Sequence, residues 1–377
     1  MTSFLRCLAV CAVAWLSLGA VGSAAIARPF LVHPPIPSDR FAAQGNPAGH
    51  LYVSGSLFDA EALGTKEGLV RYPVTNGVPA STPDLVFPKT VAGAVTVDSA
   101  GNVYSTAKCF TIDEFAPNST SVMNSIKVPI YCGDGIYNIG EVTSLAVDKA
   151  GYLYVSIVVQ CVSCGDQRER IFHPAASGPL AACVTANSKC TIVYAPGATG
   201  KATPVALITA AAYTNGMALN KAGDLFLEQA TTGDYTATSV EVYGTPETNP
   251  TLLRTLSGSS FTGTTGLAID AAGLLYVNDT VESGSEPTSS SISVFHANAS
   301  GTVTPLRTFS NSPAQVFWYG IGVDNKYLYT GTGGKLLKKT SRMIETYMKN
   351  SNGSVTPVAS VPITTTPDDP TYVAVGP

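Results

Sequence analysis

The chain has 377 residues, of which 13% are charged, and its 22 basic and 26 acidic residues give a formal net charge of −4. This mild acidic balance argues against a nucleic-acid partner, because phosphate binding needs clustered Lys and Arg. The length allows a large core in one or two domains. A composition rich in Gly, Pro, Thr, Ser, Ala and Val favours many short strands joined by turns.

The first predicted elements along the chain are a signal peptide at 1–27 and an N-terminal extension at 28–45. Arg6 places a positive charge before the apolar run 7–20, and Ala25 and Ala27 fit the small-residue positions of a cleavage site. This run is too short for a typical transmembrane helix, and no other run approaches that length, so we predict no membrane span. The mature protein is therefore expected to be secreted, in the periplasm or outside the cell.

A repeated hairpin pattern occupies most of the remaining chain, 46–377. Its clearest copy is GLAIDAAGLLYVND at 266–279, in which a turn opened by Asp and completed by Gly separates two apolar strands. The apolar character is continuous rather than alternating, which predicts strands buried on both faces. The five copies place their Asp or Asn at Asp98, Asp148, Asn220, Asp270 and Asp324. The fifth copy, VDNKYLY, is one residue shorter and lacks the Gly, so its turn must differ.

A third strand ending in an aromatic residue and a fourth strand complete each repeat. Six such aromatics occur, at Tyr72, Phe115, Tyr194, Tyr243, Phe295 and Tyr347. Four strands in about 50 residues are typical of a propeller blade. The C-terminal TYVAVGP matches a first strand and the N-terminal AGHLYVSG matches a turn and second strand. We therefore predict an all-β fold, a six-bladed β-propeller with four-stranded blades closed by pairing of the N- and C-terminal strands; a β-solenoid is the alternative.

The run GLAIDAAGLLYVND…ISVF resembles the NHL-repeat class of β-propeller, and the resemblance covers nearly all of 46–376. It implies a fold shared by binding modules, lactonases and lyases, so it does not by itself assign an activity. It also implies that a site usually lies at the central channel on the upper face, which carries the loops between second and third strands and between blades. The opposite face carries the Asp–Gly turns, and we call it the turn face.

A Cys-rich loop is inserted at 161–190 in the third blade, on the upper face. Export removes Cys7 and Cys11 and leaves six cysteines, Cys109, Cys132, Cys161, Cys164, Cys183 and Cys190. Their even number in an oxidising compartment favours disulfides, with Cys183–Cys190 as the nearest local pair and the remaining connectivity open. Zinc ligation is the alternative, with His173 as a spare ligand, but the second pair is spaced more widely than usual.

Candidate site residues are the polar and aromatic residues that lie just before each predicted first strand or just after each predicted second strand, toward the upper face. They are Glu141, Asn215, Glu228, Asn278, Asp279, Trp318, Tyr319, Asp368 and Asp369. The pattern TNGMALN is similar to gluconolactonase-like propellers, whose divalent cation is held by Glu, Asn and Asp, and Asn215 matches the Asn. Thr265 stands where the next blade of that family has Asp, so a cation such as Ca²⁺ would depend on Glu141, Asn215 and Asp279. The alternative is that the side chains of Glu141, Asn215 and Asp279 are solvated loop residues that bind no cation.

A weaker resemblance to virginiamycin B lyase-type propellers rests on LFLE, which ends at Glu228. No residue is assigned a catalytic role, because nothing in the sequence shows the burial that a general base at Glu228 would need. Two functions follow. The first is a secreted binding module for a small molecule, glycan or protein at the upper face. The alternative is a metal-dependent hydrolase or lactonase, or a lyase, at the upper mouth of the channel.

Overall fold

The computed structural model describes residues 49–55, 67–88, 90–107, 111–128, 138–161, 189–209, 216–230, 237–261, 263–283, 286–311, 317–333, 342–363 and 370–377. These residues all belong to one compact unit, His33–Pro377. They form strands and turns without a helix, which confirms the all-β prediction. The predicted signal peptide, the extension at 28–45 and residues 162–188 of the insertion lie outside the described residues and stay predictions.

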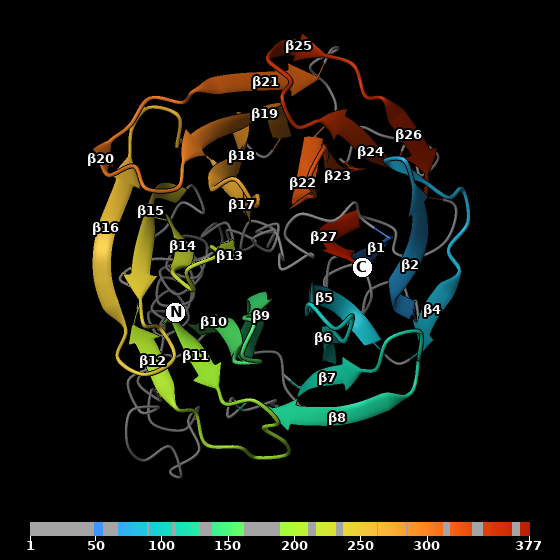
Figure 1. Ribbon diagram of the computed structural model, residues 1–377, viewed down its shortest axis with the longest axis vertical. Coiled ribbons are helices and arrows are strands. Elements are labelled where there is room, and N and C mark those ends of the chain that lie inside the picture. The colour runs from blue at the N-terminus through green and yellow to red at the C-terminus, as the bar shows by residue number, and fades with distance from the viewer. Residues whose placement is uncertain are drawn as a thin grey trace, which may run out of the picture. The chain divides into compact units, whose positions relative to one another are not determined.

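Six antiparallel sheets of four principal strands surround a centre in the ring seen in Figure 1. The innermost strand of each blade, in blade order, is β27 (Pro370–Gly376), β5 (Thr90–Val97), β9 (Asn138–Val147), β13 (Met217–Leu219), β17 (Thr264–Ile269) and β22 (Phe317–Val323). The second strands are β1 (His50–Gly55), β6 (Val103–Ala107), β10 (Leu153–Cys161), β14 (Leu225–Ala230), β18 (Leu274–Ser283) and β23 (Tyr327–Gly333).

The outer half of each blade consists of a third and a fourth strand. The third strands are β2 (Glu67–Thr75), β7 (Thr111–Phe115), β11 (Lys189–Tyr194), β15 (Ala237–Gly244), β19 (Glu286–His296) and β24 (Met343–Met348). The fourth strands are β4 (Leu85–Pro88), β8 (Val122–Lys127), β12 (Ala206–Thr209), β16 (Thr251–Ser257), β21 (Arg307–Asn311) and β26 (Ala359–Pro362). Three short strands, β3 (Val78–Pro79), β20 (Gly301–Thr302) and β25 (Gly353–Val355), lie in connections between third and fourth strands.

The register within the blades confirms the repeat predicted from the aromatic residues. In every blade the aromatic near the end of the third strand lies opposite the Leu or Val that directly precedes the Tyr or Phe of the second strand. The pairs are Leu51 with Tyr72, Val103 with Phe115, Leu153 with Tyr194, Leu225 with Tyr243, Leu275 with Phe295 and Leu328 with Tyr347. Identical register in six blades explains why one sequence pattern recurs six times.

The two ends of the chain close the first blade. β27 pairs antiparallel with β1, and Val375, Ala374 and Val373 lie opposite Leu51, Tyr52 and Val53. The innermost strand of this blade therefore comes from the C-terminus and its other strands come from the N-terminal part of the chain (Figure 1). This pairing leaves no free inner edge on β1, where an exposed ladder would invite association with other chains.

The inner strands are buried on both faces, as their continuous apolar sequence predicts. Leu145, Ala146 and Val147 of β9 follow one another and are each 0% exposed. Consecutive side chains of a strand point to opposite faces, so complete burial of three in a row requires packing on both sides. Neighbouring blades supply that packing, and aromatic contacts such as Phe87 against Phe115, with ring centroids 5.1 Å apart, join one blade to the next.

Backbone bonds also join neighbouring blades at the perimeter, at the Gly that begins each G-x-x-T-P run. In three blades this Gly has positive φ and pairs in parallel with the fourth strand of the preceding blade. The pairs are Gly200 with Ile126, Gly301 with Leu256 and Gly353 with Phe309. The recurring G-x-x-T-P run is therefore a connection between blades, a role that its sequence alone does not reveal.

Side chains on the outer half of a blade also hydrogen-bond the next blade. Each of them donates a hydrogen bond to the turn between the third and fourth strands of the following blade. The four hydrogen bonds are Arg71 to Asn118 Oδ1 (2.6 Å), Asn124 to the Ala198 carbonyl (2.7 Å), Arg254 to the Ala297 carbonyl (2.9 Å) and Arg307 to the Lys349 carbonyl (2.8 Å). Their donors share a place in the blade but not a residue type.

Candidate functional site

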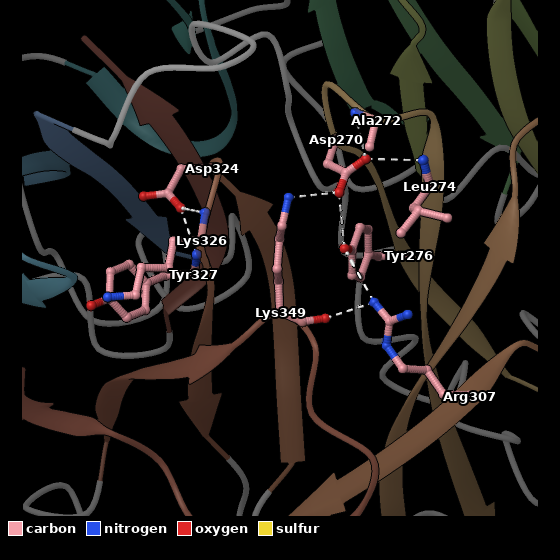
Figure 2. A network of polar contacts seen from close by, with 9 residues as sticks. All are labelled: Asp270, Ala272, Leu274, Tyr276, Arg307, Asp324, Lys326, Tyr327 and Lys349. Carbon is pink, nitrogen blue, oxygen red and sulfur yellow. Dashed lines mark hydrogen bonds and ion pairs between the residues drawn. The ribbon is translucent and has the colours of Figure 1, made fainter.

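The Asp or Asn that opens each hairpin turn caps the turn itself. Asp270 Oδ1 accepts the backbone N–H groups of Ala272 and Leu274 at 2.9 and 3.0 Å, and its Oδ2 accepts the Tyr276 hydroxyl at 3.1 Å (Figure 2). The same two backbone bonds occur at Asp98, Asp148 and Asn220. These residues fold the turn, as Asp and Asn commonly do.

The shortened fifth copy makes a tighter version of the same turn. Asp324 Oδ1 accepts the N–H groups of Lys326 and Tyr327, two and three residues ahead, at 2.7 and 2.6 Å (Figure 2). Its Oδ2 accepts the Tyr329 hydroxyl at 2.9 Å. The prediction of a different turn is confirmed, and the cap survives because it requires N–H groups rather than a glycine at a fixed place.

Asp270 also makes an ion pair across a blade junction. Lys349 Nζ lies 2.8 Å from Asp270 Oδ2, and the side chain of Asp270 is completely buried. The carbonyl of the same lysine accepts a hydrogen bond from the Arg307 guanidinium, which also lies 3.5 Å from the Tyr276 hydroxyl (Figure 2). Blades five and six are thus joined by a buried polar network, and breaking a buried ion pair by removing one partner is strongly destabilising.

Glu228, at the upper end of β14, is completely buried and reaches the next blade. Its Oε1 accepts the backbone N–H of Gly266 in β17 at 3.1 Å. A Cβ atom on Gly216 would lie 2.9 Å from Glu228 Oε2, so the absence of a side chain there makes room for the carboxylate. The sequence places Glu228 just after this strand, whereas it lies inside β14 and its carboxylate connects blades four and five.

Asn278 occupies the equivalent position of β18 and connects blades five and six. Its Nδ2 donates to the Trp318 carbonyl at 2.8 Å, and the side chain is completely buried. Its Oδ1 is buried without a hydrogen-bond partner in the described part of the chain. Asp279 follows and is 6% exposed, with Oδ1 accepting the Gly263 N–H at 2.6 Å. Both residues are buried rather than solvated.

Trp318 is a buried anchor rather than an exposed aromatic at the channel mouth. Its side chain is completely buried and its indole Nε1 donates to Glu345 at 3.2 Å. The Tyr347 hydroxyl donates to the same Glu345 Oε2 atom. Burial raises the pKa of Glu345, and the hydrogen bonds from Tyr347 and Trp318 oppose that shift only in part.

The remaining candidate site residues give no side-chain geometry. Asn215, Asp368 and Asp369 lie outside the described residues. Glu141 and Tyr319 have described backbones in β9 and β22, where they pair with Val158 and Gly331, but their side chains are outside the description. The predicted cation ligands Glu141, Asn215 and Asp279 therefore stay a prediction.

The predicted disulfides involve mostly cysteines whose side chains are outside the description. Cys190 is buried in β11, opposite Ile157 of β10. The side chains of Cys109, Cys132, Cys161, Cys164 and Cys183 lie outside the described residues, so the predicted disulfides stay predictions. Within the described ranges, no three His, Cys, Asp or Glu side chains come together as a metal-binding group.

Sequence reasoning missed two residues that organise these junctions, Glu345 and Lys349. A signal was present for Glu345, because IETY places a carboxylate inside an otherwise apolar third strand, where a buried charge needs partners. Lys349 gave no such signal, since it follows the strand in an ordinary polar turn. Its role depends on Asp270, 79 residues earlier, and only the packing of two blades brings them together.

Comparisons with known proteins support the fold and not an activity. No protein-family model and no curated protein matches the chain. Among solved structures, a protein of unknown function from Bacteroides caccae is similar over 87% of this chain and 98% of its own, with 12% identity and a TM-score of 0.53. A protein provisionally assigned as a 6-phosphogluconolactonase from Bacteroides uniformis covers 87% and 99%, with 12% identity and a TM-score of 0.50.

Within the described ranges, no helix has the length and apolar character needed to span a bilayer.

Proposed function

We propose that this protein is an exported propeller of the NHL type that binds a partner through its upper-face connections and does not act as a hydrolase. The observation that supports this is the use of the polar inner-strand residues. Glu228 and Asn278 each hydrogen-bond the backbone of an inner strand of the next blade, and Asp279 bonds the backbone of Gly263 just before β17. A buried group that satisfies a structural donor is committed to that donor, since releasing it would leave the donor unpaired. Recognition then falls to the variable connections.

The insertion at 161–190 is the binding element in this proposal. It replaces a short connection between the second and third strands of one blade, and long loops in compact domains are typically functional. Disulfides between its cysteines would hold it in one conformation and lower the entropic cost of binding. The proposed partner is a glycan, a small molecule or a protein, bound by this loop at the upper face.

A loop deletion tests the binding proposal directly. The mature chain and a variant lacking residues 165–182 would be compared on an array of defined oligosaccharides and in a thermal-shift screen of small metabolites. We expect a ligand that binds the mature chain and not the deletion variant, with both proteins melting cooperatively at similar temperatures. Equal binding by both proteins would contradict the role of the insertion.

The alternative, a cation-dependent lactonase, has a separate test. Hydrolysis of 6-phosphogluconolactone and glucono-lactone would be measured with millimolar Ca²⁺ and with chelator, for the wild type and Asn215→Ala. We expect no turnover above the spontaneous rate and no effect of chelator on the melting temperature. Calcium-dependent turnover that Asn215→Ala abolishes would establish the alternative instead.

A further inference from the structure

The exposed large aliphatic side chains of the described residues form a regular pattern on the outside of the propeller. They are Val78, Val122, Met123, Val205, Leu252, Leu253, Leu306 and Val358, and their exposed fractions lie between 46% and 56%. Each one lies in the connection to a fourth strand or among that strand's first residues. Every blade contributes at least one, so they follow the whole circumference, and we call them the aliphatic rim.

The aliphatic rim lies at the turn-face end of the blades. Alternate strands run in opposite directions, so the connections between first and second strands and between third and fourth strands emerge at the same face. The first residues of each fourth strand therefore border the face that carries the Asp turns. Exposed aliphatic groups that recur along one border indicate an interaction surface more strongly than the same groups scattered singly.

Three exposed lysines lie on this same face, at the tips of the turns between first and second strands. Lys149, Lys221 and Lys326 are exposed, and none of them takes part in the ion pairs found between described residues. The carboxylates of these turns are less exposed than the lysines. Asp148 and Asp324 accept backbone N–H groups, and Asp270 is paired with Lys349. Asp84, in a connection between third and fourth strands, is exposed but paired with Arg71. The exposed charges at the tips of the first-to-second-strand turns are therefore positive, although the chain as a whole is acidic.

Contacts spread around an entire circumference can be engaged together only by a surface that is flat over the width of the propeller. A second copy of the chain, stacked face to face, would bring lysine tips against lysine tips, which like-charge repulsion disfavours. An anionic lipid surface presents negative headgroups to the lysines and an apolar layer to the aliphatic side chains. We propose that the turn face docks on an anionic phospholipid bilayer, with the lysine tips and the aliphatic rim both in contact with it.

This docking is independent of the proposed function, because it uses the face opposite the insertion. It orients the upper face, with its binding loops, away from the lipid. It also gives the two groups of side chains separate measurable contributions, since lysine contacts weaken with salt and aliphatic contacts do not.

Vesicle binding tests the proposal with the full mature chain. Sedimentation would compare vesicles of phosphatidylcholine alone with vesicles containing about a third phosphatidylglycerol, enough for a strongly negative surface potential. We expect binding to the anionic vesicles only, falling as salt is raised. Lys221→Glu should weaken partitioning by about fivefold or more, the contribution expected of one lysine near an anionic surface.

The matched control is Lys127→Glu, which makes the same change of charge at an exposed lysine. Lys127 is the last residue of β8, five residues and about 16 Å along the strand from its turn-face end. It should leave partitioning unchanged, whereas Leu252→Ser with Leu253→Ser should weaken it while preserving the melting temperature. Absence of binding to anionic vesicles would overturn the proposal, as would equal losses in Lys221→Glu and Lys127→Glu. A dimer in light scattering that the two Ser substitutions dissociate would assign the rim to a second copy instead.

Discussion

The two ends of the second strands use polar side chains in opposite ways. At the turn face, Asp98, Asp148 and Asp270 repeat one residue type and fold their own blades. At the upper end, Glu228 and Asn278 differ in type, and each bonds the next blade. Among these polar side chains, the repeated caps build their own blades, with Asp270 also joining the next one, and the unrepeated residues join blades. A buried carboxylate at an unrepeated position is evidence of a junction as much as of catalysis.

The largest loss of stability is expected for a substitution of Asp270, which caps its own turn and also pairs with Lys349 of the next blade. Asp270→Ala removes the side-chain acceptor of two backbone N–H groups and the buried partner of Lys349, so it should cost about 3 kcal/mol of unfolding free energy. Asp98→Ala is the matched control, since Asp98 makes the same backbone bonds, and a lost cap costs about 1 kcal/mol. Urea unfolding measures both. Equal losses would show that Lys349 adds nothing to the cap.

A smaller loss is expected at the upper end, at Glu228. Glu228→Ala leaves the Gly266 N–H buried without its acceptor, which should cost about 2 kcal/mol. Glu228→Gln keeps an acceptor oxygen and should cost less. The measurement is the urea midpoint of both variants against the wild type. If Glu228→Ala proves as stable as the wild type, the carboxylate is retained for chemistry, and the distinction between the two ends fails.

The smallest expected effect is a pH dependence of folding stability that comes from the Glu345 carboxyl group. Its pKa is raised in the folded protein, mainly by burial, so its stabilising contribution is complete below the unfolded pKa and is lost as pH rises through the folded pKa. Glu345→Gln cannot ionise. The stability of Glu345→Gln relative to the wild type should therefore increase between acidic and neutral pH. A difference that is constant with pH in parallel melting curves would contradict the assignment.

The fold was open to prediction because the information that specifies a blade is local. A turn such as Asp270–Ala272, an apolar strand and a terminal aromatic lie close together in sequence, so one pattern predicts six blades and their closure. The candidate site could not be predicted in this way, because its residues contact partners that are far away in the sequence. Asn278 meets Trp318, and Glu228 meets Gly266, only after two blades have packed. The sequence predicted these residues just after their strands, whereas Glu228 and Asn278 lie inside β14 and β18 and in the junctions between blades.

The parallel pairs at G-x-x-T-P also bear on how the protein opens. β16 of blade four bonds β20 of blade five, and β21 of blade five bonds β25 of blade six. Neither β16 nor β21 can fray without breaking bonds to the following blade. Amide hydrogens such as that of Val303, which bonds the Ser257 carbonyl at 2.8 Å, should therefore exchange with solvent through concerted opening of two neighbouring blades, at rates that change together with denaturant.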